Sequence, residues 1–331
     1  MGRFAFRFFS VVVSTGILAG SGFGSPLNNR LLALVPPGSD VVAAFENHHE
    51  SHAHGQLLLA THANRLDLQD WQAMAGVDSK RVFEEIVEAA ASPFGGDLSE
   101  HMVLVGGHFD KEKIFKSVEM NGAQRSAFAG ETVMVIKPFA REQGDMLDTR
   151  WLVILDNRIG IFGTQWMVER ALKRYTGHAD IDMPLMERLT QMRSDVTSWS
   201  VLVTPQETAR AYLVSKANTP WSRFMEDAEV LMVGVHFGSK VRVDFLLHAP
   251  ADHGTEFFEQ KAESFAEVFA TDADLRPGQS RRRRLGNVAV ETDHVQASIE
   301  MSAKQFDQWA DQTNRSRTTA SLLAHATSRG E

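Results

Sequence analysis

Three stretches of this sequence repeat one pattern, and that pattern limits the fold more than any other feature. Each stretch reads as two apolar strands joined by a tight turn and followed by a helix. The three stretches are residues 149–175, 230–272 and 286–312. Their turns are Asp156-Asn157, Gly238-Ser239 and Asp293-His294, and two-residue turns suit β-hairpins. The sequence therefore predicts an α+β fold with antiparallel sheets, helices packed on one face and, because the pattern recurs, two similar halves.

Shorter signals place further elements along the chain. The β-branched, apolar run 40–46 predicts a buried strand. Residues 110–122 predict a helix that Asp110 caps and that Asn121-Gly122 ends. Residues 67–77 predict another helix, which begins at Asp67 and stops at Gly76. Other ranges have weaker signals: 84–92 and 101–109 for strands, 126–137 for a hairpin, and 55–66 for a helix.

The N-terminus has the layout of a secretory signal. Arg3 and Arg7 precede a short apolar run at 8–20, and small residues follow at 19–22. We therefore expect a signal peptide at 1–21 and a periplasmic or extracellular protein, anchored at its N-terminus if the signal is not cleaved. The apolar run falls short of the roughly 20 residues that a membrane-spanning helix needs. No other run reaches that length, so we expect no transmembrane span once the signal is removed.

Length and composition set broad limits. A chain of 331 residues can form one large or two medium domains. We expect an N-terminal α+β domain at 30–204, a C-terminal α+β domain of two hairpin-helix units at 205–312, and a flexible tail at 313–331. The formal net charge of -8 argues against a nucleic-acid partner. The absence of cysteine excludes disulfides and thiolate metal sites.

The stretch "ENHHESHAH" at 46–54 is the strongest hint of chemistry. It contains four histidines, His48, His49, His52 and His54. The imidazole group of histidine is a common ligand of zinc, copper and nickel. A helix would bring His48 and His52 to one face, whereas an extended chain would do so for His52 and His54. The sequence does not match the zinc-protease pattern His-Glu-x-x-His, because His52 comes three residues after His49 and the pattern needs four. A metal-binding site, a metal-dependent hydrolase, a pH sensor and a solvated polar loop all remain open.

Four consecutive arginines, Arg281, Arg282, Arg283 and Arg284, form the second unusual run. Such a run can contact an anionic partner, for example a lipid headgroup or a cell-wall polyanion. The alternative is a solvated or salt-bridged run that leads into a strand, since alternate strand residues point to opposite faces.

Three common motifs of catalysis and nucleotide binding do not occur in the sequence. There is no Gly-x-Ser-x-Gly elbow, P-loop or dinucleotide-binding glycine fingerprint. Carboxylates such as Glu84, Glu85 and Glu88 are too numerous for an acid/base pair to be chosen without geometry. The sequence therefore favours a non-enzymatic binding or structural protein with no certain cofactor, and an envelope component is the partner we consider.

The order of features from "LLALVPPGSDVVAAFE" onward resembles a family of uncharacterised exported bacterial proteins that is best represented in acidobacterial genomes. The matching features are the Val-Pro-Pro turn and the strand after it, "GQLLL" at 55–59, "DLQDWQAMAGVDSKR" at 67–81 and "VLVGGHFDKEKI" at 103–114. The resemblance covers roughly residues 30–205. It implies export and an α+β fold, and it implies no activity.

Overall fold

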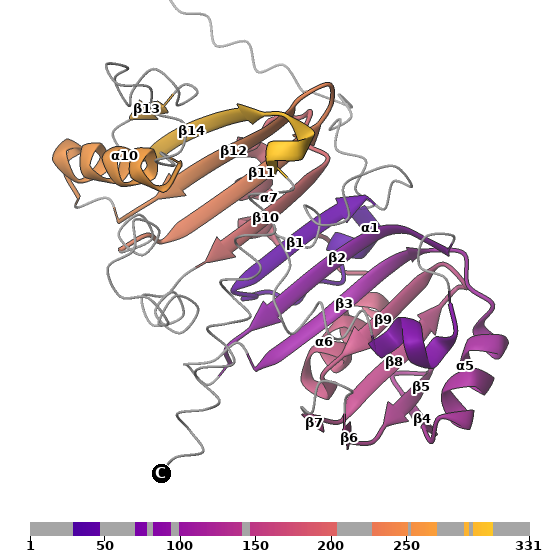
Figure 1. Cartoon of the computed structure of the whole chain (residues 1–331). Helices are drawn as coiled ribbons and strands as arrows, with labels where there is room; N and C mark the ends of the chain where they lie inside the picture. The colour runs from indigo at the N-terminus through magenta and orange to yellow at the C-terminus, as the bar shows by residue number, and fades with distance from the viewer. Residues whose placement is uncertain are drawn as a thin grey trace, which may run out of the picture.

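Most of the chain between residues 29 and 306 is described in this computed structural model. The described residues are 29–46, 70–77, 82–93, 99–140, 146–203, 227–250, 253–269, 288–290 and 294–306. Within them, twelve strands form one antiparallel sheet (Figure 1). In chain order these are β1 (Val41–Glu46), β2 (Phe83–Ala91), β3 (Glu100–Gly107), β4 (Gln124–Phe128), β5 (Glu131–Ile136), β8 (Arg150–Leu155), β9 (Ile159–Gly163), β10 (Ser198–Val203), β11 (Val230–Phe237), β12 (Val241–His248), β13 (Val288–Val290) and β14 (His294–Met301). The short strands β6 (Phe139–Ala140) and β7 (Met146–Leu147) pair with each other alone.

The sheet contains the same strand order twice. Across the sheet the order is β13-β14-β12-β11-β10-β1-β2-β3-β9-β8-β5-β4. Read outward from the middle, β10-β11-β12-β14-β13 matches β1-β2-β3-β9-β8, and β5 and β4 extend the second set. The halves join through β1 and β10, which pair antiparallel with Ala43 opposite Ser200. One continuous sheet therefore spans both of the domain ranges expected from the sequence.

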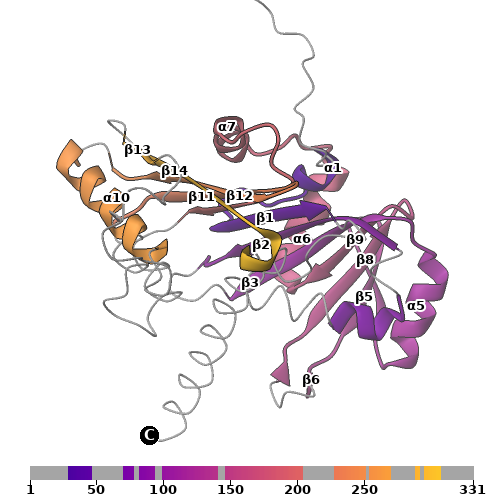
Figure 2. The same ribbon diagram turned by 45° about the horizontal axis from the view of Figure 1, so that its top comes forward.

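Helices cover both faces of the sheet (Figure 2). The first face, which carries Val87 and Leu104, packs against three helices. These are α1 (Asn29–Leu32), α6 (Gln165–Thr176) and α7 (Met183–Gln191). The second face, which carries Ile86 and Val105, packs against α5 (Lys111–Met120) and the helical residues 70–75. Farther along the sheet, α10 (Thr255–Phe269) packs on Val295.

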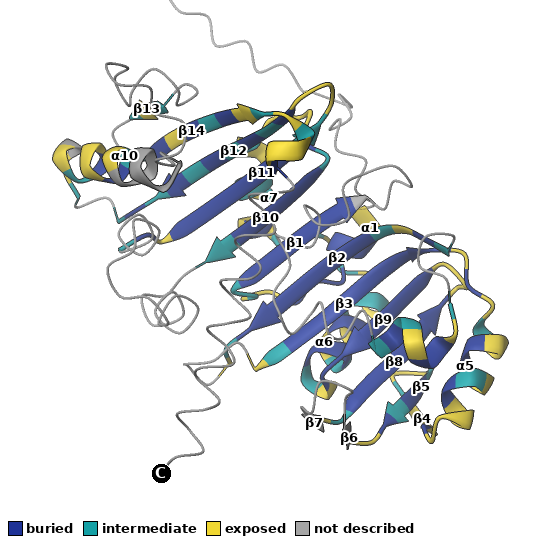
Figure 3. Cartoon of the chain, in the orientation of Figure 1, coloured by how far each residue is buried: buried dark blue, intermediate teal, exposed yellow. Residues whose placement is uncertain are grey.

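The α+β class and the hairpin-built antiparallel sheet are confirmed, but the expectation that helices pack on one face is wrong. Strand β8 has the sequence RWLVIL, and every one of its residues is buried. The same holds for β9. A strand without polar alternation is apolar on both sides, so each side needs a covering layer. Figure 3 shows buried strands between helices whose outer surfaces are exposed.

Local signals at helix ends proved accurate. The Asp110 side chain accepts a hydrogen bond from the backbone nitrogen of Lys113 at 3.1 Å, which caps α5 as expected. Gly122 ends that helix with a φ of 91°. Gly76 follows residues 70–75 with a φ of 64°. Asp67 and the helix expected at 55–66 lie outside the described residues.

One of the three hairpin turns was misplaced. Asp156 and Asn157 form the expected turn, and residues 238–240 connect β11 to β12. The turn expected at Asp293-His294 is wrong for His294, which is the first residue of β14 and pairs with His248. His294 extends β14 because pairing with β12 gives its backbone N–H and C=O groups hydrogen-bond partners. Asp293 lies outside the described residues.

None of the helices in the described part of the chain is both long and apolar enough to cross a membrane.

Candidate functional site

Both residue runs singled out in the sequence lie outside the described residues. These are His48, His49, His52 and His54, and the run Arg281–Arg284. The structure therefore neither assembles them into a site nor separates them. The metal hypothesis and the anionic-partner hypothesis stay predictions.

A polar pocket of about 310 Å³ lies at one end of strands β2 and β3. Four parts of the chain form it: α1, the start of β2, the end of β3, and the turn between β8 and β9. Its lining residues are Arg30, Glu84, Glu85, Gly106, Gly107 and Arg158. Two guanidinium groups and two carboxylates therefore surround one small volume.

A β-bulge positions the two glutamates. Phe83 pairs with Gly107, but the next paired residue of β2 is Glu85, so Glu84 is the extra residue. An extra residue bends the strand and redirects its side chains. Gly107 lets the chains come close at this point, because a Cβ there would lie 2.1 Å from the carbonyl oxygen of Val82. Any larger residue at that position would push the pocket wall apart.

The turn between β8 and β9 presents Arg158. Residues 156–158 connect the paired residues Leu155 and Ile159. Asp156 and Asn157, with φ angles of 51° and 52°, are the central residues of a β-turn that the backbone nitrogen of Arg158 closes by donating to the carbonyl of Leu155 at 2.9 Å. The backbone nitrogen of Gly107 donates to the carbonyl of Arg158 at 3.0 Å, and that of Phe109 donates to the carbonyl of Asn157 at 2.9 Å. The end of β3 thus fixes the turn in place.

Asp156 anchors one side of the pocket. Its Oδ2 atom accepts a hydrogen bond from the hydroxyl of Tyr175 at 2.7 Å. The same oxygen lies 3.4 Å from Nη2 of Arg30. The hydrogen bond with Asp156 raises the pKa of Tyr175 to about 12. Arg30 is therefore tied, through this carboxylate, to both the turn and α6.

Glu84 and Arg158 meet at His108 on the other side. Nδ1 of His108 lies 3.0 Å from Oε1 of Glu84 and 3.4 Å from Nη1 of Arg158. A carboxylate only accepts, so Nδ1 of His108 donates in the shorter contact and cannot at the same time accept a hydrogen bond from Arg158. Within the described part of the chain, no carboxylate lies within ion-pair distance of Arg158. This guanidinium lines the pocket with its donors available for a ligand.

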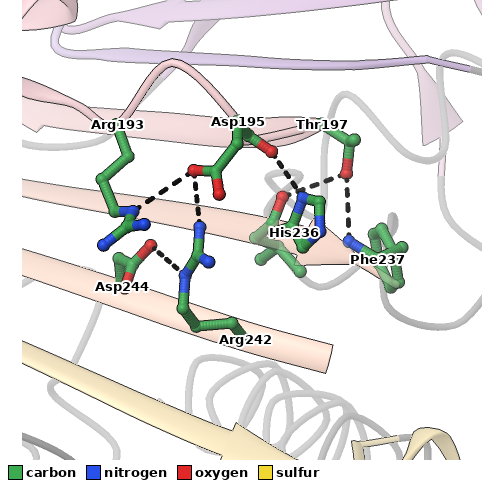
Figure 4. Close-up of polar contacts among 8 residues, drawn as sticks. Arg193, Asp195, Thr197, His236, Phe237, Arg242 and Asp244 are labelled. Atoms are coloured by element: carbon green, nitrogen blue, oxygen red, sulfur yellow. Dashed lines mark hydrogen bonds and ion pairs between the residues drawn. The ribbon is translucent and has the colours of Figure 1, made fainter. Parts of the chain in front are cut away.

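A second cluster of charges lies where the segment before β10 meets β11 and β12 (Figure 4). Oδ1 of Asp195 lies 2.6 Å from Nη2 of Arg242 and 3.2 Å from Nε of Arg193. Nε of Arg242 lies 2.9 Å from Oδ2 of Asp244. The hydrogen bond from Arg242 is the main cause that lowers the pKa of Asp195 to about 2.

Backbone contacts complete this second cluster. The hydroxyl of Thr197 donates to the carbonyl of Val235 at 3.1 Å, and the ring of His236 contacts the carbonyl of Asp195 (Figure 4). Each charge in this cluster already has an oppositely charged partner, so the cluster holds residues 193–197 against the sheet and offers a ligand little. The pocket beside Arg158 is therefore the better candidate for a ligand site.

The sequence contained partial signals for the pocket. Glu84 and Glu85 were among the carboxylates that sequence alone could not rank, and Arg30 and Arg158 were not singled out. A glycine pair at the end of an apolar strand, Gly106-Gly107, is the signal that marks a close approach of backbones. The sequence does not indicate that Arg30 and Arg158 lie beside this glycine pair, because the two arginines belong to elements far away along the chain.

No family model matches the chain, and no curated protein or solved structure matches it either.

Proposed function

We propose that this protein is a non-enzymatic binding protein of the periplasm or the extracellular space, and that it holds a small ligand with both a negative and a positive group. One observation carries the proposal: Arg30 and Arg158 line the same 310 Å³ pocket as Glu84 and Glu85. The expected location comes from the N-terminal sequence, where two arginines precede a short apolar run.

The chemistry of the lining suits a zwitterion. A guanidinium offers a planar fork of donors that matches a carboxylate or a phosphate. Arg158 has no carboxylate partner among the described residues, so an anionic ligand group would supply one. Glu84 and Glu85 would face the cationic end. A purely anionic ligand would bring its charge towards Glu84 and Glu85, and a purely cationic ligand would bring its charge towards Arg30 and Arg158. Like charges placed together lower affinity, so a ligand that carries both signs is favoured.

The size of the pocket limits the ligand. A volume of about 310 Å³ is at the lower end of the roughly 300–1,000 Å³ found for small-molecule sites. Compounds the size of an amino acid or a short peptide fit this range. The rigid strand ends and the anchored turn form the walls before a ligand arrives, so little ordering is needed on binding.

Calorimetry with matched probes tests the proposal. 4-Aminobutyrate, butyrate and butylamine share a carbon chain but differ in charge, and glycine, β-alanine and lysine vary the distance between charges. We expect at least one zwitterion to bind about tenfold more tightly than its singly charged counterparts, a difference of roughly 1.4 kcal/mol. Binding of the singly charged probes with equal or greater affinity would refute the charge argument.

Variants locate the binding. Arg158→Met and Glu84→Gln each remove one charge and retain much of the side-chain volume, so both should weaken zwitterion binding about tenfold or more. Arg125→Met is the matched control, because Arg125 is an exposed arginine whose ion-pair partners, Glu112 and Glu119, belong to α5 and not to the pocket. Equal affinities in the wild type and both pocket variants would place the ligand elsewhere.

A further inference from the structure

Two histidines face each other on adjacent strands in the C-terminal half. His248 is the last residue of β12, and His294, the first residue of β14, lies directly opposite it. Their ring centroids are 5.3 Å apart, and the ring planes are inclined by 39°. Directly opposite residues keep their Cβ atoms about 4.5–5.5 Å apart, so the sheet itself holds the two rings together.

This separation is the one that a metal ion requires of two imidazole ligands. A Zn–N bond of about 2.0–2.1 Å puts each ring centroid about 3.2 Å from the ion. Two such rings at a tetrahedral angle then have centroids about 5.2 Å apart. The observed 5.3 Å between His248 and His294 is close to this value. The spacing of the two rings is therefore compatible with both imidazoles binding one ion.

Gln191 sets the protonation of one ring. Its Oε1 atom, on the last residue of α7, lies 2.9 Å from Nε2 of His248. The oxygen can only accept, so Nε2 donates in this contact, and in the neutral ring the acceptor nitrogen is then Nδ1. Histidines that bind metals commonly donate their second ring N–H to an oxygen in this way, which fixes the tautomer and the ring orientation. This contact is a second observation, independent of the ring spacing, that favours metal binding.

We propose that His248 and His294 together bind a divalent ion of the copper, nickel or zinc type, with Gln191 as the residue that orients His248. Within the described residues, no cluster of three or more His, Asp or Glu side chains could hold a metal. The pair thus fills two positions of the ion, and water or an incoming ligand fills the others. Sites with open positions exchange their ligands, unlike the closed four-ligand sites that stabilise folds. Copper should bind most tightly of the three metals.

The proposal is separate from the zwitterion pocket and from the histidine run at 46–54. The pocket residues belong to α1, β2, β3 and the β8–β9 turn, whereas the histidine pair belongs to β12 and β14. The run supplies its own imidazoles, so a metal titration must remove it. We therefore use the untagged full chain in which His48, His49, His52 and His54 are all changed to Ala as the parent protein.

Copper titration followed by electron paramagnetic resonance tests the site. We expect the parent to bind one equivalent of Cu²⁺ with nitrogen hyperfine structure from two imidazoles. His248→Asn and His294→Asn should each weaken binding about tenfold or more and remove one nitrogen from the spectrum. Gln191→Leu, which leaves both ligands, should weaken binding by a smaller factor. His236→Asn is the control, because His236 pairs with Arg242 and no imidazole stands opposite it.

The copper titration either supports the two-histidine site or overturns it. Copper binding that is lost in the two ligand variants and kept in the control supports the site. A parent protein that binds no copper, or ligand variants that bind as well as the parent, overturns it. Circular dichroism checks the fold of each variant. If His248→Asn does not fold, His294→Asn decides the matter alone.

Discussion

The hydroxyl of Tyr175 lies 2.7 Å from Oδ2 of Asp156, and this hydrogen bond joins α6 to the turn that carries Arg158. Asp156 is in the left-handed conformation, with a φ of 51°, so the bond holds a turn of restricted geometry. Its effect on Tyr175 is a pKa raised to about 12 from an ordinary value of 10.0. The neutral phenol is thus favoured in the folded protein.

Tyr175→Phe should lower the free energy of unfolding by about 1 kcal/mol near neutral pH, because one hydrogen bond is lost. The sign of the pH dependence follows from the raised pKa. The contribution of Tyr175 is complete below pH 10.0, the unperturbed value, and is lost as the pH rises through about 12. Urea unfolding at pH 8 and at pH 11 should show the gap between wild type and variant shrinking at the higher pH.

Asp156→Asn gives a second measurement of the same bond. With the carboxylate gone, the pKa of Tyr175 should fall back towards 10.0. The chain has two tyrosines, so ultraviolet titration in a Tyr212→Phe background isolates Tyr175. A pKa that stays near 12 in the Asp156→Asn variant would show that the carboxylate is not its cause.

Local features of this fold could be predicted because each rests on neighbouring residues. Asp110 and Gly122 mark the ends of α5 through contacts within one helix. The Asp156-Asn157 turn follows from residues that tolerate positive φ. The strand at 40–46 follows from a run of apolar and β-branched residues.

Long-range features could not be predicted in the same way. Nothing in the sequence of β1 indicates that it pairs with β10, or that Ala43 lies opposite Ser200. The pocket depends on this kind of contact, since Arg30 and Arg158 line one volume only after α1 has packed on the first face. The second layer of helices was foreseeable in part, because β8 and β9 lack the polar alternation of a half-exposed strand.

Asp195→Asn should destabilise the protein by about 1 kcal/mol at neutral pH, since Asp195 is 41% exposed and its pairs with Arg242 and Arg193 are screened by solvent. The pKa of Asp195 is lowered to about 2 from 3.8. Its contribution is therefore present above pH 3.8 and is lost as the pH falls through about 2. Urea unfolding from pH 6 down to pH 2 should show the wild type losing its advantage over the variant.

A double-mutant cycle with Arg242→Met separates the pair from its surroundings. Arg242 also binds Asp244 at 2.9 Å, so Arg242→Met alone should cost more than Asp195→Asn alone. A coupling energy near zero between the two substitutions would mean that the 2.6 Å contact adds no stability.

The histidine run at 46–54 remains a prediction that calorimetry can test. Zinc, copper and nickel are titrated into the untagged chain carrying His248→Asn and His294→Asn, with and without Ala at His48, His49, His52 and His54. A metal site in the run predicts stoichiometric binding that the Ala substitutions remove, and a rise in stability that follows RT ln(1 + [L]/Kd). Equal heats from the two proteins would identify the run as a solvated polar loop.

The run Arg281–Arg284 predicts binding to anionic surfaces that weakens steeply with salt. Sedimentation with vesicles of anionic lipid should capture the protein at low ionic strength, and capture should decline as the screening length falls to about 8 Å near 0.15 M salt. Replacement of all four arginines by Ala should remove the capture, and vesicles of neutral lipid are the control. Undiminished capture after the replacement would assign the attraction to another part of the chain.

Gly160 forms a notch in the second face for the indole of Trp71. Trp71 is completely buried, and its ring centroid lies 4.9 Å from that of Phe83. A Cβ at Gly160 would lie 2.2 Å from Cη2 of this indole. Gly160→Ala should therefore lower the free energy of unfolding by about 1–3 kcal/mol, the usual cost of overpacking a core. Gly254→Ala is the control, because no atom lies within 4 Å of a Cβ there, and it should change stability by less than about 0.5 kcal/mol.

The identity of the clashing atom predicts a specific rescue. Phenylalanine at position 71 lacks the outer ring of the indole, so Trp71→Phe leaves room for a methyl group at position 160. Each substitution alone should destabilise the protein, but together they should cost less than their sum, because the methyl fills part of the space that the indole vacates. Urea unfolding of the two single variants and the double variant measures this coupling. Additive costs would show that the indole and Gly160 are not in contact, and that the helical residues 70–75 pack on the sheet in some other way.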